Sequence, residues 1–310
     1  MTTAQISLRP PSLADVYELA AFYGEVQSRY GSGGVSDEDE LRHSLTSGLI
    51  DPEHDARLAT TAGKIVGSAH VWDQARTQER LFLNVHAHPR ERAVYEALLD
   101  WGESRAADIA QGKRAVLRAA APSDDEVFSA QLEARGFEPI RHFFRMTIDL
   151  DDAPPAPEWP EGIAVRTYRS GDERPIYDAV TDAFADHWDF VPVSYEDWLR
   201  FGPQSPTFDP ALQFLAEDGE QIAGVALCQA ERRPDTGHVG ILGVRPPWRR
   251  RGLALALLRH AFTELRRRGR PMTDLGVDAE STTGAVRLYE RAGMGVAQRT
   301  DTYERRLGRP

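Results

Sequence analysis

Three arginines and a glycine stand together where an apolar strand is expected to give way to a helix. Residues 239–244 form an apolar run typical of a buried strand, and a helix-periodic run begins about ten residues later. Between them lie Arg249, Arg250, Arg251 and Gly252. Cations at a helix N-terminus oppose the helix dipole, whereas the free backbone N–H groups there stabilise an anion. Because Gly252 has no Cβ to block an approaching group, the stretch predicts a phosphate-binding loop; the alternative is a solvated arginine run.

The spacing Arg249-x-x-Gly252-x-Ala254 resembles the acyl-CoA pyrophosphate loop of the GCN5-related N-acetyltransferase (GNAT) family. A second motif of that family follows one helix and one strand later, around Tyr289 and Gly293, without its usual opening asparagine. Met294 replaces the common phenylalanine of this motif. The resemblance implies that acetyl-CoA is bound by the following residues: Leu242, Gly243, Val244, Arg249, Arg250, Arg251, Gly252, Leu253, Ala254 and Thr282.

Acetyl transfer from a thioester to an amine has three chemical requirements. The amine must lose a proton, the carbonyl oxygen must be stabilised, and the departing thiolate must be protonated. The resemblance places a tyrosine hydroxyl near the CoA sulfur, so Tyr289 is predicted to be the general acid. The alternative is an aromatic side chain that only packs its helix onto the sheet. The resemblance also implies that the central strand separates from its neighbour near residues 242–244 and offers backbone N–H groups to the oxyanion.

Two residues are candidates for the general base. His238 stands near the start of the central strand, where the mycothiol synthases, tandem GNAT members of similar length, carry a glutamate. An imidazole with a pKa near neutrality suits removal of an ammonium proton, whereas a histidine at a hairpin end can equally be a solvated residue. Glu231, near the end of the preceding strand, is the competing base. An acceptor that arrives already deprotonated needs neither.

A segment after the first helix of the second half interleaves aromatic and acidic residues. An amine acceptor is cationic before it reacts, so carboxylates set among aromatic rings suit its binding. The candidate acceptor-binding residues are Asp186, Trp188, Asp189 and Glu196. The alternative is a polar loop with aromatic side chains packed beneath it.

The chain also contains an internal repeat. A constant shift of 157 residues takes Arg9 to Arg166, Gly67 to Gly224 and Gly136 to Gly293. In each half the patterns predict a strand, helices, a hairpin, a central strand, a long helix, a strand, a short helix and a final strand. This alternation predicts an α/β fold with a mixed sheet, and the resemblance implies two tandem GNAT folds. We predict domains at residues 1–150 and 162–310, joined by a proline-rich linker at residues 151–161.

The two halves differ in the groups that chemistry needs. At the shift of 157, Gly252 corresponds to Tyr95 and Tyr289 to Leu132, which cannot exchange a proton. The first half is therefore predicted to be a degenerate domain with a structural or substrate-shaping role. One acetyl-CoA is expected per chain, in the catalytic second half.

Composition excludes several classes of protein. The formal net charge of −11 over 310 residues argues against a general binder of nucleic acid or anionic membranes. Cys228 is the single cysteine, so no internal disulfide forms, and no Cys/His spacing predicts a metal site. No signal pattern or membrane-length apolar run is present, which predicts a cytoplasmic protein, monomeric or homodimeric.

The prediction is therefore an acetyl-CoA-dependent N-acetyltransferase that acts on a primary amine, most simply of a small molecule. Two alternatives remain open: a non-catalytic acyl-CoA-binding sensor, and a mycothiol-synthase-like acetyltransferase of thiol metabolism. The hydroxyl of Tyr289 argues against the sensor, because binding alone does not need it.

Overall fold

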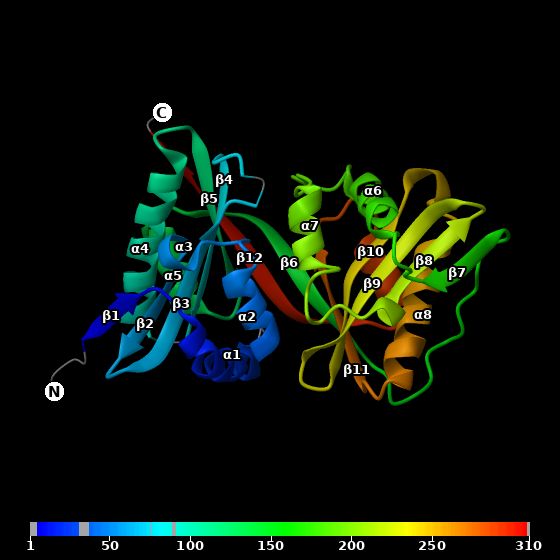
Figure 1. Ribbon diagram of the computed structural model, residues 1–310, viewed down its shortest axis with the longest axis horizontal. Coiled ribbons are helices and arrows are strands. Elements are labelled where there is room, and N and C mark those ends of the chain that lie inside the picture. The colour runs from blue at the N-terminus through cyan, green and yellow to red at the C-terminus, as the bar shows by residue number, and fades with distance from the viewer. Residues whose placement is uncertain (1–4, 31–36, 75, 89–90, 309–310) are drawn as a thin grey trace. The chain divides into compact units, whose positions relative to one another are not determined.

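The computed structural model describes the chain except for residues 1–4, 31–36, 75, 89–90 and 309–310. The described residues form two compact units. The first unit takes its residues from Met1–His142 and Gln298–Pro310, and the second is Phe143–Ala297. Each unit has a mixed sheet with helices on both faces, so the predicted α/β class is confirmed (Figure 1). Within the described ranges, no helix is long and apolar enough to cross a membrane.

The sheet of the first unit has the order β1-β2-β3-β4-β5-β12, in which only β4 and β5 run parallel. Its strands are β1 (Ile6–Arg9), β2 (Ala56–Thr61), β3 (Lys64–Trp72), β4 (Arg80–Ala87), β5 (Ala115–Pro122) and the last part of β12 (Gly295–Leu307). Its helices are α1 (Val16–Tyr30), α2 (Glu38–Thr46), α3 (Pro52–Asp55), α4 (Arg92–Ala110) and α5 (Glu126–Ala134). Successive strand residues point to opposite faces, so Leu58 packs under α1 while Ala59 packs under α4.

The second unit repeats this plan with the order β6-β11-β10-β9-β8-β7, in which β10 and β11 are the parallel pair. Its strands are β6 (Glu138–Asp149), β7 (Ile163–Thr167), β8 (Gln213–Asp218), β9 (Gln221–Arg233), β10 (Thr236–Val244) and β11 (Met272–Asp278). Its helices are α6 (Glu173–Phe184), α7 (Tyr195–Phe201), α8 (Leu253–Arg267) and α9 (Ala285–Arg291). Helices α8 and α9 pack on one face of the sheet, and α6 and α7 pack on the other. Figure 1 labels α6, α7 and α8 around this sheet.

One ion pair marks the repeat at the atomic level. In the first unit, Arg9 contacts both carboxylate oxygens of Asp15 at 2.5 and 2.8 Å. In the second, Arg166 contacts both oxygens of Asp172 at 2.6 and 2.9 Å. Each pair ties the first strand of its unit to the start of the following helical segment, and both residues obey the shift of 157. In both pairs the arginine holds the carboxyl pKa below its ordinary value, against the opposing effect of burial.

The structure divides the chain differently from the predicted boundaries at 150 and 162. Strand β6 begins in the first unit, but its residues 143–149 pair with β11 of the second. Strand β12 begins in the second unit, and its residues 300–307 pair with β5 of the first. Each half therefore completes its sheet with the last strand of the other half. An apolar strand pattern predicts that a strand exists but does not say which sheet edge it joins.

The proline-rich segment between the repeats belongs to the second unit and runs along α8. Arg266 donates to the Leu150 carbonyl at 2.8 Å, and Arg259 pairs with Glu158 at 3.1 Å. The Trp159 ring also meets His260 edge-on, with ring centroids 5.7 Å apart. Three side chains of α8 therefore hold this segment against the unit.

Candidate active site

The two parallel strands at the centre of the second unit separate part of the way along. β10 and β11 pair only where residues 236–238 meet residues 272–274, with His238 opposite Asp274 as the last pair. Beyond His238 the other edge of β10 continues to pair with β9, after a bulge at Gly240. In the described chain, the edge that faced β11 has no further strand partner. Backbone groups that point to this edge from residues 242–244 therefore have no strand partner there.

The loop after β10 is shaped to receive an anion. Gly252 caps α8 with φ of +86°, and a Cβ built on it meets nothing within 4 Å. No side chain caps α8, so the N–H groups of its first turn, which have no intrahelical acceptors, remain available. Arg250 and Arg251 are exposed beside this turn. Open space, free donors and positive charge together fit the pyrophosphate of acetyl-CoA.

Arg249 is held differently from its two neighbours. Its guanidinium contacts both carboxylate oxygens of Asp186, at 2.5 and 3.0 Å, and donates to the Ala183 carbonyl at 3.0 Å. Its Nε donates to the Val244 carbonyl at 3.1 Å. The pair with Arg249 lowers the pKa of Asp186. Arg249, predicted to bind acetyl-CoA, and Asp186, predicted to bind the acceptor, thus form an ion pair with each other. This pair fastens the anion loop to the end of α6.

His238 is a buried residue and not a solvated hairpin end. Its Nδ1 lies 2.6 Å from Asp274 Oδ1, and its Nε2 lies 2.9 Å from a guanidinium nitrogen of Arg232. The two partners assign a neutral imidazole that donates from Nδ1 and accepts at Nε2. Burial lowers the pKa of His238, although the hydrogen bond to Asp274 works in the opposite direction. Burial acts to raise the pKa of Asp274, but the hydrogen bond from His238 and the nearby charges outweigh it and lower that pKa.

The competing base has another partner. Glu231 is exposed, and its carboxylate pairs with Arg270. Of the two candidates, His238 is the one that a carboxylate orients.

Tyr289 lies on α9 and is 8% exposed within the core beneath α8 and α9. Burial raises the pKa of its hydroxyl to about 12. The hydroxyl is therefore fully protonated at neutral pH, as a general acid must be before it acts. Thr282, also predicted for this region, is exposed in the loop before α9.

The other predicted acceptor residues lie on the surface around α7. Trp188 is 40% exposed, Asp189 has φ of +53°, and Glu196 is exposed in the first turn of α7. Close by, Tyr195 and Trp198 stack with ring centroids 6.1 Å apart. This stack is the arrangement expected of aromatic side chains packed beside a polar loop.

Asp274 is the functional candidate that sequence reasoning missed. It is fully buried in β11, where it also accepts a hydrogen bond from Arg233 at 2.5 Å. A lone aspartate inside an apolar strand was the available signal, because a buried carboxylate needs a partner. The identity of that partner depends on the pairing of β10 with β11.

In the first unit, the described residues that correspond to the anion loop form part of a helix instead. Its helix α4 begins at Arg92, so residues 92–95, which correspond to 249–252, form the first helical turn. Tyr95 is 3% exposed, and its hydroxyl donates to Asp125 Oδ2 at 2.7 Å. Its ring stacks on Phe128 of α5 at 4.6 Å between centroids. The tyrosine therefore points into the core and fastens α4 to the start of α5.

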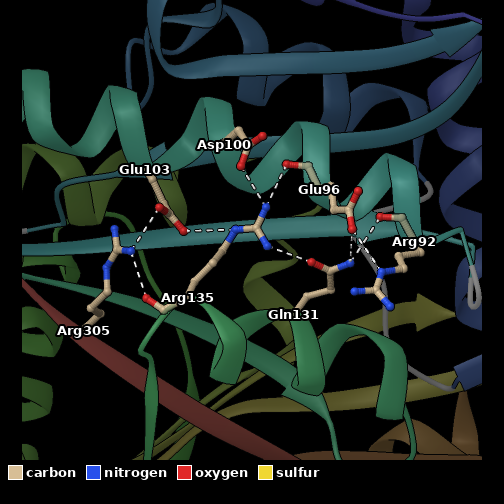
Figure 2. Close-up of polar contacts among 7 residues, drawn as sticks. All are labelled: Arg92, Glu96, Asp100, Glu103, Gln131, Arg135 and Arg305. Atoms are coloured by element: carbon tan, nitrogen blue, oxygen red, sulfur yellow. Dashed lines mark hydrogen bonds and ion pairs between the residues drawn. The ribbon is translucent and has the colours of Figure 1, made fainter.

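A polar network continues this attachment along α4 and α5 (Figure 2). Arg135 contacts Asp100 at 2.8 Å, Gln131 at 2.7 Å and Glu103 at 3.3 Å. Gln131 also donates to Glu96 at 3.1 Å. The residues of α8 and α9 that correspond to Glu96, Asp100, Gln131 and Arg135 are Leu253, Leu257, Leu288 and Ala292. These apolar residues form no such network in the described chain.

Comparisons with known proteins identify relatives along the whole chain. Residues 174–294 match the Acetyltransferase (GNAT) family. The chain is 35% identical to the mycothiol acetyltransferase of Geodermatophilus obscurus, with 84% of each chain covered. It is 33% identical to that of Streptomyces scabiei, which covers 96% of this chain and 94% of the relative.

Two solved structures show how far the fold is shared. A GCN5-related N-acetyltransferase from Sphaerobacter thermophilus has a TM-score of 0.78 and 34% identity, covering 99% of this chain and 98% of that one. A tandem GNAT protein from the clavulanic acid biosynthesis pathway has a TM-score of 0.71, covering 99% of this chain and 100% of that one. At 16% identity, the second likeness concerns the fold alone.

Proposed function

The chain belongs to the GCN5-related N-acetyltransferase (GNAT) family and is an acetyl-CoA-dependent N-acetyltransferase, and we propose that its second unit acetylates the primary amine of a small molecule. The predicted tandem GNAT architecture is confirmed by the solved relatives. One observation carries the proposal. The opening between β10 and β11 ends at a histidine that a buried aspartate orients. A base held by a second group beside a ligand opening is the geometry of proton transfer.

The residues for holding acetyl-CoA lie along β10 and at the start of α8. We assign its pyrophosphate to the backbone N–H groups of Gly252, Leu253 and Ala254, with Arg250 and Arg251 supplying charge. The free edge of residues 242–244 supplies hydrogen bonds to the thioester end. Arg249 and Asp186 act as positioning residues, because both are engaged with each other and with the loop.

When bound, acetyl-CoA supplies a thioester carbonyl for the amine to attack and a thiol that must leave protonated. His238 takes the proton of the acceptor ammonium at Nε2, the atom that now accepts from Arg232. Arg232 is an exposed residue, so its side chain can leave this position to a substrate cation. Asp274 keeps the imidazole in the tautomer that accepts at Nε2 and stabilises it once it is charged.

Tyr289 provides the second proton transfer. Its hydroxyl, protonated at neutral pH, donates to the sulfur as the carbon–sulfur bond breaks. Backbone N–H groups of residues 242–244 face the carbonyl oxygen as it gains charge. The acceptor nitrogen keeps the acetyl group and loses two protons in becoming an amide nitrogen. The first goes to His238 before the attack, and the second passes after the attack to the Tyr289 oxygen, which has given its own proton to the sulfur.

A second candidate is the activity that the relatives' name states, acetylation in mycothiol formation. The similarity to the mycothiol acetyltransferases favours it, because the similarity extends over most of both chains. His238 at the position of their expected glutamate counts against it. The cytoplasmic location, the monomeric or homodimeric state and the lack of a metal stay predictions.

The test is thiol release from acetyl-CoA over a panel of amines that includes the amine precursor of mycothiol. Turnover confined to that precursor would select the second candidate. Acetyl-CoA binding without turnover of any amine would favour a sensor instead. We expect an amine-dependent rate that disappears when the second unit's anion loop is altered.

A further inference from the structure

Arg145 on β6 is a half-buried cation that forms a long ion pair with Asp274. Its side chain is 23% exposed, and its ion pair with Asp274 spans 3.6 Å from Nη1 to Oδ2, too long for a hydrogen bond. Its Nε is buried without a partner. Burial and then the charge of Arg233 lower the pKa of its guanidinium. Buried guanidinium N–H groups are normally satisfied, so those of Arg145 call for an acceptor.

The register of the strands puts this cation beside the proposed base. β6 pairs with β11 so that Arg145 lies opposite Gly276, two residues along from Asp274. Asp274 in turn pairs with His238. Because alternate residues of a strand share a face, Arg145 and Asp274 lie on the same side of the sheet. Leu275 points to the other side, into the core under α8, so this is the side that α6 and α7 cover.

Positive charge exceeds negative charge around Arg145 and Asp274, and there is room for a ligand beside them. Asp274 bonds to Arg233, so one carboxylate serves two guanidinium groups. The Nε of Arg233 is also buried without a partner. A Cβ built on Gly276 meets nothing within 4 Å, so open space adjoins Arg145. The next carboxylate on this face of β11 is Asp278, beyond Gly276.

We propose that the acceptor carries an anionic group, a carboxylate or a phosphate, which binds Arg145 while its amine faces His238. The planar guanidinium offers parallel donors that match either group. This inference rests on the function proposed above and narrows it. The acceptor becomes an amine that also bears an acid, such as an amino acid or an amino-sugar phosphate. A neutral amine leaves the donors of Arg145 unpaired.

The first arm of the test compares acceptors that differ only in the acid group. Glucosamine 6-phosphate is set against glucosamine, and L-amino acids against their carboxamides. The wild type should favour the anionic member of a productive pair by about 10- to 100-fold in kcat/KM. Arg145→Gln should bring that ratio close to one, while Arg145→Lys keeps part of it. Arg259→Gln, which removes a guanidinium from α8 on the opposite face, should leave the ratio unchanged.

The second arm measures anion binding without turnover. Inorganic phosphate and acetate are titrated calorimetrically into protein saturated with coenzyme A, so that the start of α8 is already filled. The wild type and Arg259→Gln should bind at least one probe, and Arg145→Gln should bind it at least about 10-fold more weakly. Thermal unfolding verifies that each variant is folded. If Arg145→Gln is not, Arg145→Lys takes its place and should show weaker binding, because an ammonium lacks the parallel donors.

The two arms separate the failure of this inference from the failure of the proposed function. Binding of neither probe, equal binding by Arg145→Gln, or a preference for neutral acceptors would overturn the anionic acceptor. Arg145-dependent anion binding in a protein that turns over no amine would overturn the proposed function and leave the anion site in place.

Discussion

Residues 249–252 and residues 92–95 occupy the same place in the repeat but have different structures. In the second unit they are an open loop whose glycine, at φ of +86°, leads into α8. In the first unit they are the first turn of α4, and a buried tyrosine takes the place of the glycine. Tyr95 uses its hydroxyl and its ring to bind α5. The same backbone position is thus open in one unit and filled by a core side chain in the other.

This difference shows how the start of a helix can stay open in one copy of a repeat and be closed by side chains in the other. The network from Arg92 to Arg135 fills the interface between α4 and α5 with hydrogen bonds (Figure 2). A ligand between these helices would have to break these hydrogen bonds, including those of the buried Gln131, and a buried polar group left unpaired is costly. In the second unit, apolar residues replace Glu96, Asp100, Gln131 and Arg135 of this network. No polar network joins α8 to α9 in the described chain. We therefore expect acetyl-CoA to bind one unit only.

The largest expected effect is the loss of acetyl-CoA affinity when position 252 receives the tyrosine that the first unit has at the corresponding position. Gly252→Tyr places a side chain in the anion loop and a non-glycine residue at positive φ, so acetyl-CoA affinity should fall at least about 100-fold. Isothermal calorimetry measures this, and circular dichroism should show an unchanged fold. Gly252→Ala is the matched control: it shares the backbone strain without the bulk and should lose less. Two equivalent acetyl-CoA sites in the wild type would show that the comparison between units is mistaken.

Removing the proposed base should come next in size. His238→Ala should lower kcat/KM by about 10²- to 10³-fold. Only the neutral imidazole can accept a proton, so the wild-type rate should rise with pH. Burial lowers the pKa of His238, so the midpoint should lie below the ordinary histidine value of about 6.5. A pH–rate profile that keeps this rise in the variant would pass the role to Glu231, to water or to a free amine.

A smaller loss is expected from removing the proposed acid. Tyr289→Phe deletes one hydroxyl and almost no volume, so kcat should fall roughly 10- to 100-fold with little change in the KM for acetyl-CoA. Leu132→Tyr, the reverse change in the first unit, should add no activity, because Tyr95 and its partners still close that unit. Full turnover by Tyr289→Phe on a good acceptor would refute the assignment.

The smallest effect should come from weakening the contact between α4 and the start of α5 in the first unit. Tyr95→Phe removes the hydrogen bond to Asp125, and the unfolding temperature should fall by about 2–4 °C. Differential scanning calorimetry measures this change. Turnover in the second unit should stay within about twofold of the wild type. A new acetyl-CoA site in this variant would mean that one hydroxyl alone keeps the first unit closed.

Local patterns of sequence determined the motifs of this protein. The loop from Arg249 to Ala254, the helix after it and the position of Tyr289 follow from short spacings that local backbone geometry enforces. The repeat and its asymmetry at Gly252 and Tyr95 could likewise be found by aligning the halves. These features can be predicted without knowing which strands are neighbours in the sheet.

Tertiary structure alone decided which side chains meet. Asp274 contacts both His238 and Arg145, because β6, β11 and β10 are neighbours in one sheet. The bulge at Gly240 also matters: His238 faces α6, whereas Leu81, at the corresponding position of β4, packs under α4. One extra residue in a strand reverses the faces of those beyond it, and local spacing cannot reveal that change. Local spacing also cannot reveal that β6 joins the sheet of the second unit and β12 the sheet of the first. Strand pairing depends on sheet edges that only the folded chain brings together.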